Sequence, residues 1–181
     1  MFDTLVAVFY ILFLNENIKR RRIFMLIPLL LGCATVFVTM SVQIGTLVYM
    51  LQYLFRLLHK AEDKALSKGR TTYVIGAVMM TLFTGHLLQV AIWAVLFRRV
   101  GEFDDFSTAF YHSMVNFASL GYGDIVMGER WRLLGAIEAS TGVLMFGVSA
   151  GVMLAVMTRI LTQDARFRDR LDEIKLRDHH Q

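Results

Sequence analysis

The fold is decided by the stretch Phe117-Ala118-Ser119-Leu120-Gly121-Tyr122-Gly123-Asp124, a short loop between two long apolar segments. These segments, Tyr73 to Phe97 and Leu133 to Thr158, are each long enough to cross a ~30 Å hydrocarbon core as a helix. Non-helical backbone at membrane depth is tolerated only where it is buried in protein or lines a water-filled path. The loop is therefore expected to line such a path.

The two glycines of this loop indicate what its backbone does. Gly121 and Gly123 have no Cβ and adopt positive φ at little cost, so they let successive carbonyl oxygens turn in one direction. In an ordinary strand the carbonyls would alternate. Carbonyl oxygens that point at a common axis can replace the water shell of an ion.

The residues from Ser119 to Asp124 resemble the Thr-Val-Gly-Tyr-Gly-Asp signature of the potassium-channel pore family. The resemblance covers about Asp104 to Thr158, from a short amphipathic segment through the loop to a glycine-containing apolar segment. Two positions depart from the family pattern. Leu120 stands where valine is usual, and Ala118 stands where a second threonine is frequent.

The resemblance implies an all-α membrane protein built around a pore module, residues 73–160. Its expected parts are an outer helix (73–97), a pore helix (106–117), a selectivity filter (119–124, here the filter loop) and an inner helix (133–160). One loop cannot surround an ion, so the resemblance implies a homotetramer. Potassium ions would bind the backbone carbonyls of Ser119, Leu120, Gly121 and Tyr122. The Ser119 hydroxyl would lie at the inner end, and Gly123 would complete the filter.

Other residues are expected to support the filter or to move the inner helix. Asp124 would lie behind the outer mouth, where it shapes the filter or concentrates cations. Glu138 lies in an apolar span and needs a partner or water, so it either braces the filter or is hydrogen-bonded near the interface. Gly142 and Gly147 are candidate gating hinges, and close helix packing explains them equally well.

The composition indicates a membrane protein. Of the 181 residues, 56% are hydrophobic, and the mean hydropathy is +0.52. The net charge of +4 comes from basic residues beside apolar spans, which favours anionic lipids over nucleic acid as partners. No nucleophile–base pair or metal-ligand spacing indicates an enzyme, and no cofactor is expected besides bound K⁺.

The N-terminal part is expected to contain two segments. Residues 1–22 include the apolar run Leu5 to Leu14, which reaches only about 15 Å as a helix and is interpreted as interfacial or re-entrant. Residues 23–58 are predicted to form an extra transmembrane helix, with Pro28 in its first turn, where proline is tolerated.

The remaining segments set the predicted topology. Residues 59–72 form a basic cytoplasmic linker, and 161–181 form an amphipathic tail helix, so the C-terminus is cytoplasmic. This arrangement leaves the basic run Lys19 to Arg22 outside, against the positive-inside rule. The resemblance implies an integral protein of a prokaryotic inner membrane. His86, a polar residue in the outer helix, is interpreted as an interhelical contact or as a proton-sensing group.

Three functions remain open on the sequence. The first is a potassium-selective channel. The second is a cation channel of the same architecture that discriminates weakly between sodium and potassium, because Leu120 departs from the pattern. The third is a non-conducting membrane scaffold or accessory subunit.

Overall fold

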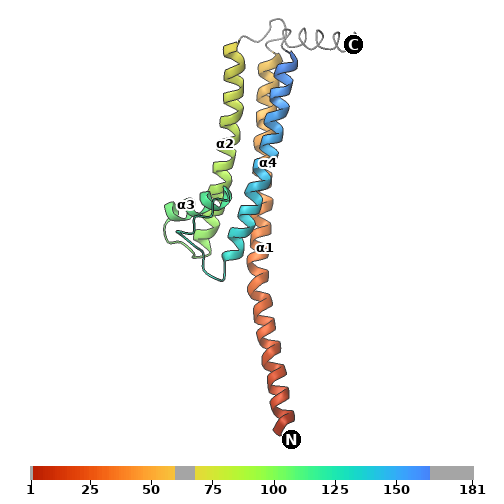
Figure 1. Ribbon diagram of the computed structural model, residues 1–181, viewed down its shortest axis with the longest axis vertical. Helices are drawn as coiled ribbons and strands as arrows, with labels where there is room; N and C mark the ends of the chain where they lie inside the picture. The colour runs from red at the N-terminus through yellow and green to blue at the C-terminus, as the bar shows by residue number, and fades with distance from the viewer. Residues whose placement is uncertain (1, 60–67, 164–181) are drawn as a thin grey trace, which may run out of the picture. The chain divides into compact units, whose positions relative to one another are not determined.

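The computed structural model describes residues 2–59 and 68–163, with side chains described for 24–56 and 69–160. It contains four α-helices in these ranges: α1 (Phe2–His59), α2 (Lys68–Arg99), α3 (Phe106–Phe117) and α4 (Arg132–Gln163) (Figure 1). No strand occurs in the described part of the chain. The predicted all-α fold is therefore confirmed.

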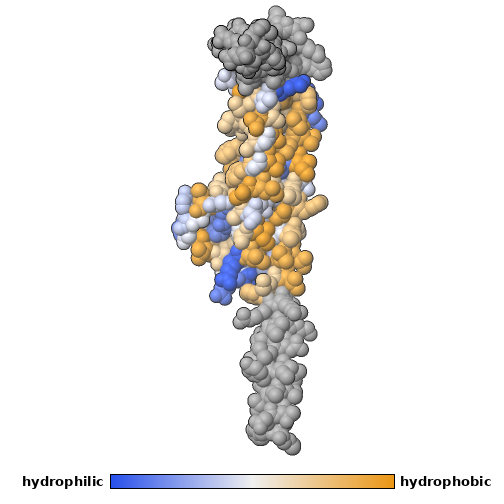
Figure 2. All heavy atoms as spheres, turned by 45° about the vertical axis from the view of Figure 1, so that its right-hand side comes forward, coloured by the Kyte–Doolittle hydropathy of each residue, from blue (hydrophilic) through white to orange (hydrophobic). Residues whose placement is uncertain are grey.

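Three of the described helices are long and apolar enough to cross a membrane. The candidate spans are Phe24–Arg56, Gly69–Arg99 and Arg132–Ile160. Hydrophobic side chains cover most of the described surface on the face shown in Figure 2. Exposed apolar residues of the described helices include Leu30, Phe37 and Leu154, at 68%, 74% and 67%. An exposed apolar surface of this kind suits lipid tails, so the chain is an all-α membrane protein.

The N-terminal helix differs from the expected division at residue 22. Residues 2–59 form one uninterrupted helix, so the predicted interfacial segment and first span share a single element. The basic run Lys19–Arg22 does not end the helix, because lysine and arginine are good helix formers. Pro28 consequently lies inside α1 and not in a first turn, which corrects the expectation.

The other helix bounds lie near the predicted ones. α3 occupies the predicted range Phe106–Phe117, whereas α2 begins at Lys68 and so includes part of the expected linker. α4 extends one residue before and three residues beyond the predicted inner helix. The rest of the linker (60–67) and the tail from 164 lie outside the described residues.

The chain divides into two compact units, and the first comprises Met1–Thr39 and Val90–Val143. It holds the end of α2, all of α3, the filter loop and the start of α4. The short helix α3 lies beside the end of α2, where the Ser113 hydroxyl donates to the Val90 carbonyl at 2.8 Å (Figure 1). Trp93 and Phe97 of α2 are fully buried in this unit. These contacts fix the helix from which the filter loop departs.

The second unit comprises Met40–Gln89 and Leu144–Gln181. Its apolar core joins three helices and consists of Met50, Leu54, Val74, Val78, Leu82, Val156 and Ile160. Beside this core lies a buried polar chain. Gln89 Nε2 donates to Gln43 Oε1 at 2.7 Å, and Gln43 Nε2 donates to Ser149 Oγ at 3.1 Å.

His86 belongs to the same polar chain of the second unit. Its Nε2 is 3.0 Å from Ser149 Oγ, and its ring packs edge-on against Phe146. This arrangement is the interhelical contact that the sequence offered as one interpretation of His86.

Candidate functional site

α3 begins at a well-formed cap. Asp105 Oδ2 accepts the Thr108 backbone N–H at 3.1 Å and also bonds the Ser107 hydroxyl. The bond from Ser107 has the largest effect on the pKa of Asp105, and together with the bond from Thr108 it lowers that pKa. Asp105 is therefore the N-cap of α3.

α3 ends in a Schellman motif that leads directly into the filter loop. The Ser119 N–H donates to the Asn116 carbonyl at 2.8 Å, and the Leu120 N–H donates to the Val115 carbonyl at 2.9 Å. In this motif the residue after the helix cap has positive φ, and Ser119 has φ 56°. The last turn of α3 therefore fixes the direction in which the loop begins.

The backbone of the loop alternates in handedness. Ser119, Gly121 and Gly123 have φ of 56°, 57° and 74°, whereas Leu120 and Tyr122 between them are not at positive φ. In a uniform strand successive residues face opposite sides. A change in the sign of φ at every second residue removes this alternation and lets the carbonyls face one side.

The glycines of the loop are required by conformation and not by space. A Cβ added to Gly121 or Gly123 would meet no atom within 4 Å. Its cost would come from the positive φ, which L-residues with a side chain rarely adopt. Ser119 has the same handedness and bears that cost within the Schellman motif.

Two adjacent residues of α3 hold the residues that follow the filter. The Tyr111 hydroxyl donates to Asp124 Oδ2 at 2.7 Å, and the Ile125 N–H donates to Asp124 Oδ1 at 3.0 Å. The bond from Tyr111, followed by the backbone bonds, lowers the pKa of Asp124. Asp124 is thus held as a carboxylate at the C-terminal end of the loop.

His112 provides the second connection. Its Nδ1 lies 3.1 Å from the Ile125 carbonyl, which can only accept, so Nδ1 carries the hydrogen. The Asn116 amide nitrogen lies 2.9 Å from His112 Nε2. Burial lowers the pKa of His112 and outweighs the Ile125 bond and the Glu102 and Asp124 carboxylates, which act to raise it. The buried, neutral ring therefore bonds on both sides.

Glu138 lies behind α3 and is fully buried. Its Oε1 is hydrogen-bonded to the Ser113 hydroxyl, which also donates to the Val90 carbonyl. Oε2 has no hydrogen-bond partner within the described residues. α4, α3 and α2 are thus joined through one serine, and Glu138 faces protein and not lipid.

Gly142 and Gly147 have different surroundings. A Cβ on Gly142 would lie 1.9 Å from the carbonyl oxygen of Phe117, the last residue of α3, so only glycine allows this approach. A Cβ on Gly147 would meet nothing within 4 Å. α4 is helical through both positions. Close packing therefore explains Gly142, and Gly147 keeps the hinge hypothesis.

The predicted loop residues differ in their contacts. The Ser119 hydroxyl reaches the Ala139 carbonyl only at 3.5 Å, while Leu120 and Tyr122 are 53% and 65% exposed. No group of three or more His, Cys, Asp or Glu side chains that could hold a metal occurs in the part of the chain that the structure describes. The positive φ at every second residue of the loop makes its backbone carbonyls the candidate cation ligands.

Tyr111, His112 and Ser113 were not predicted from the sequence as supporting residues. Each bonds a group at least 13 residues away in the chain, and the filter motif carries no information about such partners. One signal was available. Polar residues cluster on a short helix between two spans, and polar side chains at membrane depth need specific partners.

Comparison with known proteins bears on the kind of protein that this chain is. Residues 81–159 match a family model described as ion channel. No curated protein and no solved structure matches the chain. The matched range includes α3, the filter loop and the spanning part of α4, together with the second half of α2. The match supports the interpretation of this membrane protein as an ion channel.

Proposed function

We propose that the chain is one subunit of a potassium-selective channel, in which K⁺ moves passively through a ring of backbone carbonyls. The observation that carries the proposal is the sign of φ along the loop, which is positive at every second residue, Ser119, Gly121 and Gly123. This loop follows a helix that is too short to span a membrane. Carbonyls on one side of the chain replace the hydration shell of K⁺. The K⁺ ligands are the carbonyls of Ser119, Leu120, Gly121 and Tyr122, with the Ser119 hydroxyl at the inner end.

Four copies around one axis complete the site. A single loop offers ligands on one side of an ion only, and rotational symmetry supplies the others. The exposure of Leu120, Tyr122 and Val126 supports the assembly, because large apolar side chains beside a water-filled path need cover from neighbouring subunits. The C-terminal end of α3 adds a partial negative charge near the ion.

The supporting residues have distinct roles in this proposal. Asp124 holds the outer end of the filter through Tyr111 and concentrates cations at the mouth. Glu138 braces α3 from behind through Ser113. Gly147 allows α4 to bend for gating. The C-terminus is cytoplasmic, in the inner membrane of a prokaryotic cell.

Cation flux into liposomes tests the proposal. Purified protein is reconstituted, and K⁺ and Na⁺ uptake are compared under matched gradients, with the oligomer measured by native mass spectrometry. We expect four subunits and K⁺ uptake well above Na⁺ uptake. A stable monomer, or no uptake of either ion, would contradict the channel and favour a non-conducting scaffold.

Leu120 favours a second candidate, a weakly selective cation channel of the same architecture. Its side chain is larger than that of valine and is 53% exposed in its own chain. The fit of this side chain between subunits therefore decides how rigidly the neighbouring carbonyls are held. Reversal potentials with K⁺ on one side and Na⁺ on the other distinguish the two candidates. Leu120→Val then tests whether this position sets the preference.

A further inference from the structure

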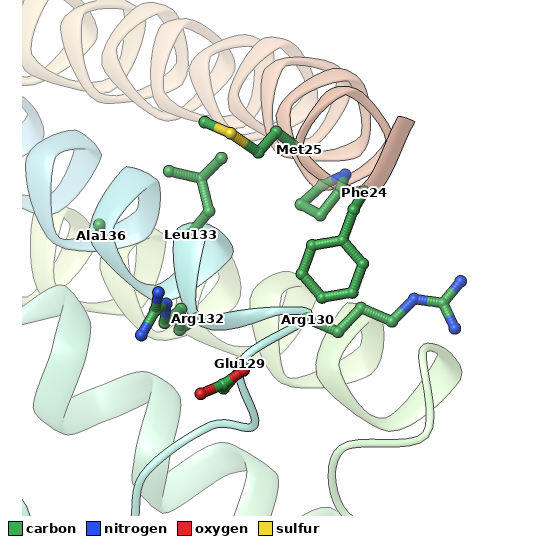
Figure 3. Close-up of a pocket in the computed structure, with 8 residues that line it drawn as sticks. Phe24, Met25, Glu129, Arg130, Arg132, Leu133 and Ala136 are labelled. Atoms are coloured by element: carbon green, nitrogen blue, oxygen red, sulfur yellow. The ribbon is translucent and has the colours of Figure 1, made fainter. Parts of the chain in front are cut away.

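A pocket of about 650 Å³ lies in the first unit between α1, α4 and the turn that precedes α4. Figure 3 shows Phe24 and Met25 on the α1 side and Leu133 and Ala136 on the α4 side. The remaining lining residues are Pro28, Glu129, Arg130 and Arg132. The pocket therefore combines apolar walls with a charged rim.

The position of this pocket along the helices corresponds to the edge of the hydrocarbon core. The helix α4 and its candidate span begin at Arg132, which lines the pocket. Apolar groups on the span side of this level face acyl chains, whereas groups on the other side face lipid headgroups. A ligand that fits has one apolar part and one polar part.

The rim carries a surplus of positive charge. Arg130 and Arg132 line it with one carboxylate, Glu129, and neither arginine forms an ion pair within the described residues. The Arg130 guanidinium stacks 4.9 Å from the centre of the Trp131 ring, which limits its freedom. The basic run Lys19–Arg22 ends two residues before Phe24 on the same helix. Guanidinium groups bind phosphate oxygens through paired hydrogen bonds.

We propose that this pocket binds an anionic phospholipid, with its phosphodiester at Arg130 and Arg132 and an acyl chain along Met25 and Leu133. The rim recognises a phosphate group, and inorganic phosphate carries the same group. Two features favour the lipid. The walls are apolar, and Glu129 disfavours the second negative charge that free phosphate carries at neutral pH and a phosphodiester lacks.

Native mass spectrometry of the full chain, stripped of lipid in detergent, tests the site. The protein is titrated with phosphatidylglycerol and, separately, with zwitterionic phosphatidylcholine. Arg130→Gln/Arg132→Gln should weaken phosphatidylglycerol binding by roughly 25-fold, at about 5-fold for each arginine near the lipid surface. Arg98→Gln/Arg99→Gln, the matched control, removes the same charge from the last turn of α2, outside the pocket lining, and should leave binding unchanged.

Two further measurements separate the lipid from the anion. Ala136→Leu fills the apolar wall without changing charge and should reduce phosphatidylglycerol binding. Inorganic phosphate should fail to displace the bound lipid at equal concentration. Equal losses in the two double variants, binding that is insensitive to Ala136→Leu, or displacement by phosphate alone would each overturn the proposal. The readout is lipid binding, so it is independent of conduction.

Discussion

The Tyr111 hydroxyl donates a 2.7 Å hydrogen bond to Asp124 Oδ2, which joins the middle of α3 to the last residue of the filter loop. Since a phenol bonded to a carboxylate makes a charge-assisted bond, Tyr111 is the main side-chain anchor of this end of the loop. The same bond lowers the pKa of Asp124 and raises that of Tyr111, so both groups keep these protonation states around neutral pH.

Tyr111→Phe removes this bond and keeps the ring. We expect a filter that holds its conducting form less well, seen as K⁺ uptake that starts normally and declines faster than in the wild type. Tyr49→Phe is the matched control, because Tyr49 belongs to the second unit and lies far along the chain from the filter loop. If Tyr111→Phe and Tyr49→Phe behave alike, Asp124 is not held through Tyr111.

His112 predicts a pH dependence of stability. Its lowered pKa means that the unfolded chain takes up a proton at about pH 6.5, whereas the folded chain does so only at lower pH. Between these values the unfolded state binds more protons, so stability is complete above about pH 6.5 and is lost as the pH falls. Thermal unfolding in detergent should show a flatter acid dependence for His112→Gln than for the wild type. An equal dependence in both proteins would exclude His112 as the source.

The filter glycines should respond to alanine through conformation alone. Gly121→Ala and Gly123→Ala are expected to abolish selective K⁺ uptake, because a Cβ at positive φ turns a carbonyl away from its direction. Gly76→Ala is a close control. It also adds a Cβ into open space, but within the helix α2, where alanine is favoured by about 0.5–1 kcal/mol. Normal selectivity in both filter variants would show that the loop is not the filter.

The sequence predicted the elements whose signals are local. Apolar length located the spans, and the predicted pore helix 106–117 coincides with α3. Ser119 shows where local signals end. Its positive φ comes from the Schellman motif, which usually contains glycine or asparagine at this position, so serine gave no indication of it.

Long-range partners could not be predicted for a physical reason. Glu138 had to find a partner because a buried carboxyl is costly, but which helix supplied it depends on how α3 packs on α4. The close approach of Gly142 to Phe117 depends on the same packing. The continuity of α1 was missed because a charged run was interpreted as a boundary, although its residues favour helix.

The polar chain of the second unit should stabilise the packing of its three helices. Ser149→Ala removes the hydroxyl that contacts both Gln43 and His86. We expect a loss of about 0.6–1.7 kcal/mol, the range for hydrogen bonds between membrane helices. Ser140→Ala, on the same helix, removes a hydroxyl that bonds only the Ala136 carbonyl within its own helix, and should cost less. Equal unfolding temperatures for the two variants would contradict a stabilising role of the chain.

Glu138 offers the sharpest test of the bracing role, because its hydrogen bond with Ser113 can be replaced. The Ser113 hydroxyl has one hydrogen, for which the Val90 carbonyl and Glu138 Oε1 both compete. In Glu138→Gln the amide N–H donates to Ser113 Oγ, and the hydroxyl hydrogen remains for Val90. We therefore expect Gln to keep conduction near the wild-type level. Ala leaves a cavity of the kind that costs about 2 kcal/mol or more and frees α3 from α4.

Single-channel recordings with a parallel measurement of the oligomer separate bracing from assembly. The bracing role predicts a lower open probability, or a less stable conducting state, in Glu138→Ala than in Glu138→Gln. Both variants should keep the subunit number of the wild type, since the spans supply most of the packing. Wild-type currents in Glu138→Ala would show that the carboxyl only satisfies Ser113. A loss of the oligomer in Glu138→Ala alone would make it an assembly residue.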